Sequence, residues 1–149
     1  MGDDSFCGLC LNGDIEGVQA AIDNGADVNE EDDLFGKTGL MWAFYRNHNN
    51  VVQLLLNQPQ IDVNKVDQQG RSVLDWALNL DNHEGLAALL ARHDVLATSI
   101  NQRDRSGYVP IVTAACWNSV KCFHLLLTHP LVDLDTRDGY ERTPQEVRG

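Results

Sequence analysis

The chain has 149 residues, of which 43% are hydrophobic and 22% are charged, and it carries a formal net charge of −11 at pH 7. This length suits one domain with a buried core. The acidic balance argues against nucleic acid as the main partner, because binding to a phosphate backbone depends on clustered Lys and Arg, and the aliphatic runs are shorter than the ~18 apolar residues of a membrane span.

The amino-terminal part of the chain carries most of the charge. Residues 1–36 hold ten acidic and no basic side chains (−10), while residues 37–149 hold twelve acidic and eleven basic ones (−1). The first ten residues, MGDDSFCGLC, lack the basic region and the apolar run of a signal peptide. We therefore expect a well-solvated acidic end and a cytoplasmic or nuclear location.

One pattern recurs along the chain. The stretches GKTGLMWA, GRSVLDWA and GYVPIVTA end at Ala43, Ala77 and Ala114, which are 34 and 37 residues apart. Each copy has a glycine seven residues before the alanine, a leucine thirteen residues after it, and an aspartate three residues before the glycine. These positions are Gly36, Gly70 and Gly107; Leu56, Leu90 and Leu127; and Asp33, Asp67 and Asp104. The stretch 12–29 preserves the second half of an earlier copy.

Each copy predicts the same local structure. Asp-x-x-Gly favours a turn, Thr38 and Ser72 can cap a helix, and Pro110 suits a first helical turn. A short apolar helix, a polar break and a second helix follow, and an extended segment ends the copy. At the break, the first copy has Gly13, and the later copies have residues that tolerate a left-handed backbone, namely Asn47, Asp81 and Asn118.

Two short helices and a turn cannot bury their own apolar faces, but stacked copies can. The pattern resembles the ankyrin repeat, which has about 33 residues and the signature T-P-L-H-x-A, although no copy keeps the signature histidine. The resemblance implies an all-α solenoid of helix-turn-helix repeats with short β-turn or hairpin tips. It predicts a single domain with repeats at 1–32, 33–66, 67–103 and 104–137, and a partial repeat or C-terminal cap at 138–149. In that last segment we expect Thr143-Pro144 to open a short helix.

Nothing in the sequence indicates catalysis. The chain lacks a nucleophile elbow, a zinc-protease motif, a P-loop and a dinucleotide-binding motif, so we expect no enzyme, no cofactor and no metal. Cys7-x-x-Cys10 could be half of a zinc site, but Cys116 and Cys122 would lie three helix layers away, roughly 25 Å. Buried thiols are the favoured interpretation, and we expect structural roles for the histidines, including His48.

The resemblance implies a protein-interaction module, an adaptor or scaffold, whose concave groove and turn tips bind a partner. The alternative is a regulatory or targeting segment of a larger multidomain protein or enzyme. Trp42 and Trp76 are expected to pack in the core, whereas aromatic and basic residues on the tips and first helices could bind a partner or simply form a solvated edge. The candidate binding residues are Phe35, Lys37, Tyr45, Arg46, Arg71, Arg105, Tyr108, Trp117, Tyr140 and Arg142. Because none is acidic, we expect a partner peptide or loop with acidic and apolar residues that lies across copies two to four. We also expect a monomeric protein.

The resemblance also implies a possible modification. Ankyrin repeats are substrates of an asparaginyl hydroxylase that favours a leucine eight residues before the asparagine of a D-V-N sequence. Leu56 and Asn64 match this pattern, whereas Asn29 has Ala21 at the leucine position. Asn64 is therefore the candidate acceptor, and the alternative is that Asn64 only stabilises its turn.

Overall fold

The computed structural model describes residues 4–92, 99–104, 106–137 and 141–148. The chain divides into two compact units, unit 1 (Met1–Trp76) and unit 2 (Ala77–Gly149). Two of the candidate binding residues, Arg105 and Tyr140, lie outside the described residues. Within the described ranges the structure consists of helices, turns and one isolated β-bridge between Glu31 and Thr38. The predicted all-α fold is confirmed.

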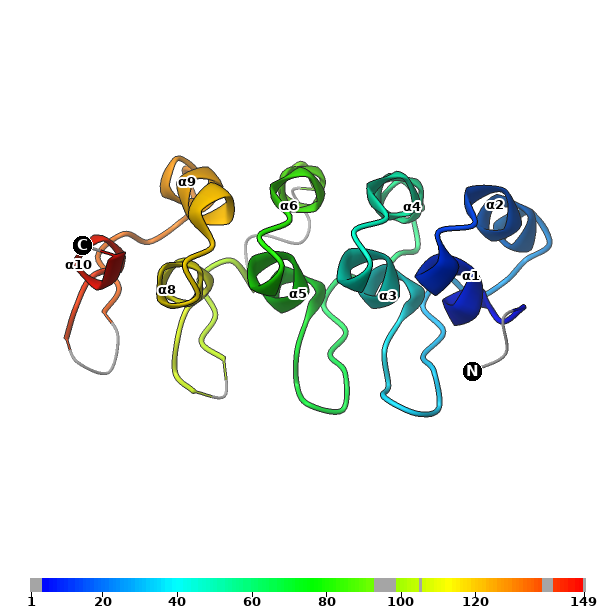
Figure 1. Ribbon diagram of the computed structural model, residues 1–149, viewed down its shortest axis with the longest axis horizontal. Coiled ribbons are helices and arrows are strands. Elements are labelled where there is room, and N and C mark those ends of the chain that lie inside the picture. The colour runs from blue at the N-terminus through cyan, green and yellow to red at the C-terminus, as the bar shows by residue number, and fades with distance from the viewer. Residues whose placement is uncertain (1–3, 93–98, 105, 138–140, 149) are drawn as a thin grey trace. The chain divides into compact units, whose positions relative to one another are not determined.

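Unit 1 is built from two helix pairs and the start of a third. The helices are α1 (Phe6–Asn12), α2 (Ile15–Asp23), α3 (Gly39–Tyr45), α4 (Asn49–Leu56) and the first part of α5 (Val73–Asn79). In Figure 1, α1 lies beside α3 and α2 lies beside α4, so that the two pairs form two layers. The tips at 30–38 and 66–72 extend away from these layers.

Unit 2 contains the remainder of α5 and four further labelled helices. These are α6 (His83–Leu90), α8 (Pro110–Cys116), α9 (Val120–Leu127) and α10 (Pro144–Arg148). Here α8 packs against both α9 and α10, and α6 packs against α9. The unit therefore repeats the two layers of unit 1.

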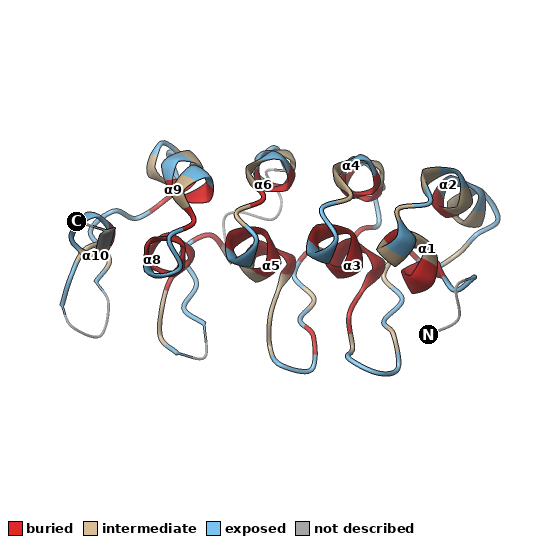
Figure 2. Cartoon of the chain, in the orientation of Figure 1, coloured by how far each residue is buried: buried red, intermediate tan, exposed pale blue. Residues whose placement is uncertain are grey.

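The core of each unit is centred on the first helix of a copy. Residues 40–44 of α3 and 110–115 of α8 are all buried, as the red helices of Figure 2 show. The second helices bury only part of their surface, through residues such as Val51, Leu55 and Leu126. A first helix is enclosed because its own second helix and the first helix of a neighbouring copy both pack on it, as α1 and α4 do on α3.

The predicted helix starts are confirmed. The Thr38 hydroxyl accepts a hydrogen bond from the backbone N–H of Met41 at 3.3 Å, and Pro110 occupies the first turn of α8. At the C-terminal end, Thr143 and Glu146 form a reciprocal cap, with Thr143 N donating to Glu146 Oε2 at 2.6 Å and Glu146 N donating to Thr143 Oγ1 at 3.4 Å. The helix that we expected to begin at Thr143-Pro144 is α10.

The predicted left-handed residues are confirmed as well. Between the two helices of each copy, φ is 71° at Gly13, 61° at Asn47, 48° at Asp81 and 55° at Asn118. One residue in this backbone region turns the chain from one helix to the next. His48 follows the left-handed residue of the second copy, and its Nε2–H donates to the carbonyl oxygen of Leu11 at 3.0 Å, which is the structural role expected of it.

The tip of the second copy differs from the one that the repeat alignment predicts. Asp67 N donates to Arg71 O at 2.9 Å, but the matching bond of the second copy joins Asp32 N to Lys37 O at 2.9 Å. This tip therefore contains one additional residue, and Asp32, rather than Asp33, is the counterpart of Asp67. Spacing from the glycine alone pointed to the wrong aspartate.

Candidate functional site

Four aromatic rings of unit 1 contact one another in a row, which we call the aromatic cluster (Phe35, Trp42, Tyr45 and Trp76). The ring centroids are 5.9 Å apart for Phe35 and Trp42, 5.6 Å for Trp42 and Tyr45, and 5.5 Å for Tyr45 and Trp76. The interplanar angles of 73° to 84° make each contact edge-to-face, the arrangement that the ring quadrupoles favour. The cluster joins the tip at 30–38 to α3 and to the start of α5.

Exposed and buried rings alternate along this row. Phe35 is 47% exposed and Tyr45 is 44% exposed, whereas Trp42 and Trp76 are 6% and 4% exposed. The core packing predicted for the two tryptophans is confirmed. Because each exposed ring rests against a buried one, the cluster offers rigid apolar area at the surface.

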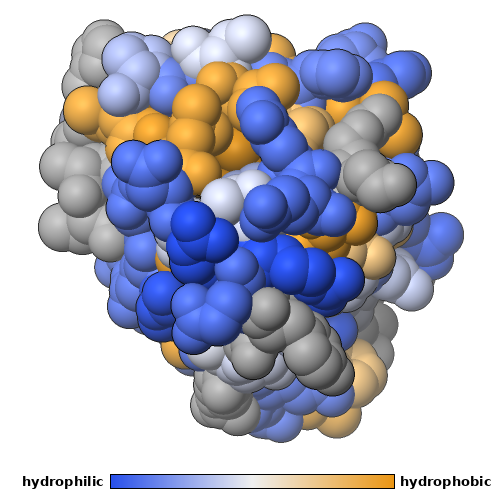
Figure 3. Space-filling model, turned by 90° about the vertical axis from the view of Figure 1, so that its left-hand side faces the viewer, coloured by the Kyte–Doolittle hydropathy of each residue, from blue (hydrophilic) through white to orange (hydrophobic). Residues whose placement is uncertain are grey.

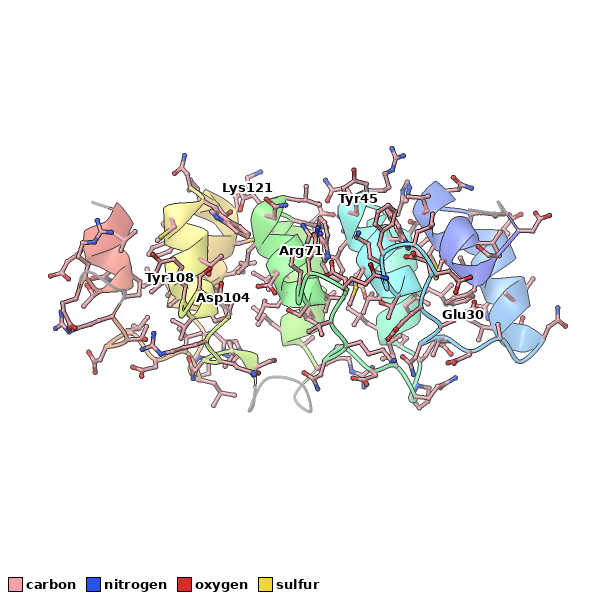
Figure 4. The ribbon with its side chains drawn as sticks, turned by 90° about the horizontal axis from the view of Figure 1, so that it is seen from below. Glu30, Tyr45, Arg71, Asp104, Tyr108 and Lys121 are labelled. Atoms are coloured by element: carbon pink, nitrogen blue, oxygen red, sulfur yellow. The ribbon has the colours of Figure 1, made fainter. Side chains whose placement is uncertain are left out.

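Three cationic side chains lie over these rings. The Arg71 guanidinium carbon is 4.2 Å from the ring centroid of Trp76, and that of Arg46 is 5.8 Å from Tyr45. Lys37 Nζ lies 4.4 Å from Phe35, 4.9 Å from Trp42 and 5.3 Å from Trp76. Such contacts stabilise a cation through the negative ring faces. Figure 4 shows Tyr45 and Arg71 in unit 1, seen from the side of the tips.

Lys37 is not the exposed tip residue that the sequence predicts. Its side chain is only 6% exposed, because it folds back over the aromatic cluster instead of extending into solvent. Burial lowers the pKa of Lys37, an effect that the negative charge of Asp67 opposes. Arg71, at the matching position of the next tip, is partly exposed and forms an ion pair with Asp67, with Nε 3.2 Å from Oδ2.

Asp32 holds the first of these tips together. Its carboxylate accepts hydrogen bonds from the backbone N–H groups of Leu34, Phe35 and Lys37 and, at 2.9 Å, from the indole Nε1–H of Trp42. Burial acts to raise the pKa of Asp32, but these hydrogen bonds lower it overall. The backbone of the tip and the first tryptophan are thereby fixed to one charged group.

In unit 2 the structure describes three of the candidate binding residues, Tyr108, Trp117 and Arg142. Trp117 caps the C-terminal end of α8 and is 49% exposed. Tyr108 is half-buried; its backbone N–H donates to Asp104 Oδ1 at 2.9 Å, and both residues are labelled in Figure 4. Arg142 is exposed. Seen from the side of α10, a band of hydrophobic side chains crosses the upper half of this face, with hydrophilic side chains above and below it (Figure 3).

The cysteines differ in part from the prediction. Cys7, Cys10 and Cys122 are buried thiols, as expected, but Cys116 is exposed because it lies in the last turn of α8. Burial raises the pKa of Cys7 to about 12 and that of Cys122 to about 12, which makes both thiols poor nucleophiles. The described residues contain no group of three or more His, Cys, Asp or Glu side chains that could hold a metal ion. No helix among them is long and apolar enough to cross a membrane.

Sequence reasoning missed the part that Trp42 and Trp76 play in the cluster. Both stand directly before the alanine of their copy, and each follows a tip aspartate, Asp32 or Asp67. That recurrence was a usable signal, because an indole N–H in a core needs an acceptor. Within the described residues, Trp42 has such an acceptor and Trp76 does not.

Comparison with known proteins agrees with the repeat architecture. A family model described as "Ankyrin repeats (3 copies)" matches residues 6–104. The chain is 29% identical over 134 residues to inversin of Gallus gallus, covering 89% of this chain and 12% of inversin. It is 29% identical over 129 residues to rabankyrin-5 of Homo sapiens, covering 87% of this chain and 11% of that protein.

A shorter match is to the photoreceptor ankyrin repeat protein of Homo sapiens, with 36% identity over 88 residues, or 58% of this chain and 19% of the relative. The chain thus spans only a small part of the curated relatives that it matches. The family model covers well over half of the chain. With its helix pairs, left-handed turns and recurring tips, the chain belongs to the ankyrin repeat family.

Proposed function

We propose that the chain is a protein-interaction module, an adaptor or scaffold, that binds a partner peptide or loop through its tips and first helices. Ankyrin repeats are generally protein-interaction modules. The observation that carries the proposal is the exposure of Phe35 and Tyr45 at the surface of a rigid aromatic cluster. Aromatic residues and arginine contribute most of the energy of protein interfaces, because they bury large areas at a low entropic cost.

The partner segment carries acidic and apolar residues. Arg46 is exposed beside Tyr45, and Arg71 is partly exposed beside Trp76. Arginine can pair with a carboxylate through two parallel hydrogen bonds, and the neighbouring rings offer contact to apolar side chains. In unit 2, Trp117 and Tyr108 are the corresponding aromatic candidates and Arg142 is the basic one.

Selection from a displayed library of random twelve-residue peptides tests this proposal. We expect enriched peptides to bind the chain and to lose affinity by about 1–3 kcal/mol when Tyr45 or Phe35 is replaced by alanine, as hot-spot residues do. Leu131→Ala is the matched control, because Leu131 is an equally exposed apolar residue outside the tips and first helices. Trp117→Ala measures the contribution of unit 2.

Circular dichroism verifies that each variant keeps the helical content of the parent. If Tyr45→Ala, Phe35→Ala and Trp117→Ala all bind the peptides as well as the parent does, the tips and first helices are not the binding surface. If no peptide is enriched, the chain does not bind short linear segments and the proposal fails.

A second candidate is a regulatory or targeting segment of a larger protein. The observation in its favour is that the chain spans only 12% of inversin and 11% of rabankyrin-5. The sequence of the full-length transcript decides between the two, because a catalytic domain in the same reading frame favours the segment and its absence favours the separate adaptor. The proposal also includes a cytoplasmic or nuclear location and a monomeric state, which imaging of a tagged chain and sedimentation equilibrium test.

A further inference from the structure

The two tryptophans of the aromatic cluster occupy the same repeat position but differ in their hydrogen bonding. Trp42 Nε1–H donates to Asp32 Oδ2 at 2.9 Å. Trp76 Nε1 is buried and, among the described residues, has no hydrogen-bond partner. A buried indole N–H without an acceptor is uncommon and destabilising, because its bond to water is lost and nothing replaces it.

The carboxylate of the matching tip bonds to other donors. Asp67 Oδ2 accepts from Arg71 Nε at 3.2 Å, and Asp67 Oδ1 accepts from the backbone N–H groups of Gln69 and Arg71 at 2.9 Å each. In this copy the tip carboxylate therefore bonds to an arginine, whereas in the preceding copy it bonds to the tryptophan. Among the described residues, Trp76 remains a donor with no acceptor.

Lys37 adds a cation without a carboxylate partner to the same place. Its ammonium nitrogen lies 5.3 Å from the ring centroid of Trp76, and no carboxylate in the described part of the chain lies within ion-pair distance of it. The Asp32 carboxylate is already used by three backbone N–H groups and by Trp42. Among the described residues, the cluster therefore contains one buried indole donor without an acceptor and one ammonium group without a carboxylate partner.

We propose that Lys37 Nζ and Trp76 Nε1 bind the side-chain carboxylate of an Asp or Glu in the partner segment. This inference rests on the proposed function and names the chemical group that anchors the partner. A carboxylate supplies the acceptor that the indole N–H lacks and a negative charge beside the ammonium of Lys37. Arg71 strengthens the preference for an anion, because its guanidinium lies over the same indole ring.

The anchor is reached beside Tyr45. Tyr45 is the most exposed of the side chains known to contact the Trp76 ring, and it is the last residue of α3. Its ring contacts the Trp76 ring edge-to-face, with centroids 5.5 Å apart. A partner segment bound at the anchor would therefore also pack its apolar part on the exposed face of Tyr45.

The test measures whether the affinity that a carboxylate in the peptide contributes requires the indole N–H of Trp76. Affinity is measured for an acidic peptide from the random library and for versions of it in which each Glu or Asp is changed in turn to Gln or Asn. Each peptide is measured on the parent chain and on the Trp76→Phe variant. Phenylalanine keeps an aromatic ring but removes the donor. We expect the acidic peptide to lose about tenfold in affinity on Trp76→Phe, and one neutralised peptide to bind both chains equally.

Trp42→Phe is the matched control, because it removes an indole N–H that already has an acceptor, and the preference for the acidic peptide should survive it. Lys37→Met provides a second variant, which should also reduce that preference. The parent chain alone gives an independent measurement, because the ¹H–¹⁵N resonance of the Trp76 indole should shift on addition of the acidic peptide far more than that of Trp42.

The outcomes separate this inference from the proposed function. Suppose that peptides bind and that their affinity falls on Tyr45→Ala. If their acidic residues can then be neutralised without loss of affinity, or contribute as much affinity on Trp76→Phe as on the parent chain, the carboxylate anchor is wrong and the proposed function stands. An unchanged Trp76 indole resonance at saturating peptide would overturn the anchor as well. If no peptide binds at all, both proposals fail.

Discussion

Replacing Asn47 or Asn118 with glycine should stabilise the protein. Their φ angles are 61° and 55°, both residues are exposed, and no hydrogen bond from either side chain is found within the described ranges. The left-handed region costs an L-residue about 1–2 kcal/mol, less for asparagine and almost nothing for glycine. After subtraction of the greater entropy of glycine in the unfolded chain, we expect each substitution to raise the free energy of unfolding by about 0.5 kcal/mol. Alanine at the same positions should lower it by about 1 kcal/mol.

Asp81 provides a control of opposite sign. Its φ of 48° is equally left-handed, but Asp81 Oδ1 accepts a hydrogen bond from the backbone N–H of Cys122 at 2.9 Å, and Oδ2 accepts from that of Lys121 at 3.4 Å. Glycine would remove the strain of the left-handed backbone, but it would leave the first turn of α9 without this acceptor. The loss is about 1.5–3 kcal/mol for a bond to a charged group, so Asp81→Gly should destabilise the protein.

Urea denaturation followed by circular dichroism measures all of these variants, and thermal melting should show shifts of about 2–4 °C for each kcal/mol in a chain of this size. The refuting result is specific. If Asp81→Gly stabilises the protein as much as Asn47→Gly does, the hydrogen bond to Cys122 contributes nothing. If glycine and alanine at position 47 are equivalent, the left-handed backbone carries no strain.

Three further predictions concern single groups. Asp32→Asn should lower the free energy of unfolding at pH 7, and the deficit should begin to shrink below about pH 4. A carboxyl whose pKa is lowered in the folded state contributes its full stabilisation above the unfolded value and loses it as the pH falls through the folded pKa; urea titrations at both pH values check this. A thiol reagent at about pH 8 should modify Cys116 first, and Cys7 and Cys122 only after unfolding. Burial raises the pKa of Cys7 and of Cys122 to about 12; peptide mapping identifies the labelled residue. If an asparaginyl hydroxylase acts on the chain, mass spectrometry should find the added oxygen on the exposed Asn64 and not on Asn29, whose side chain is held by Gln60 O at 2.8 Å and Asp62 N at 2.7 Å.

The helix framework could be predicted from the sequence because local chemistry determines it. The Thr38 cap, Pro110 in a first turn and the left-handed Asn47 each follow from the residue itself and its immediate neighbours. The repeat then multiplied these local signals, since a turn that is weak evidence in one copy recurs in the next at nearly the same spacing. The helix that begins at Pro144 was predictable for the same reason.

The candidate site was less predictable because it depends on contacts between copies. Lys37 was expected in solvent, yet its side chain is buried among rings that come from its own tip, from α3 and from the start of α5. An alignment on glycine could not show that the tip before α3 has one additional residue, so it selected Asp33 instead of Asp32. In both cases the position of the side chain depends on contacts in three dimensions, which spacing along the sequence does not show.

The difference between the two tryptophans leads to a final prediction at Arg71. In the second copy the residue before the helix cap is Lys37, and the tip carboxylate, Asp32, is left to accept from Trp42. In the third copy that residue is Arg71, its Nε donates to Asp67 Oδ2, and Trp76 has no acceptor among the described residues.

Arg71→Lys removes Nε and should allow Asp67 to accept from the Trp76 indole, as Asp32 does from Trp42. The free energy of unfolding should then rise, or at least not fall, although the ion pair with Asp67 is lost, because a buried donor gains its acceptor at about 1–3 kcal/mol. The Trp76 indole proton should exchange more slowly with solvent, and the preference for acidic peptides should weaken because the indole N–H is now satisfied. A substantially less stable Arg71→Lys chain with unchanged indole exchange would mean that Asp67 cannot reach Trp76, and that the missing acceptor is not a consequence of the arginine.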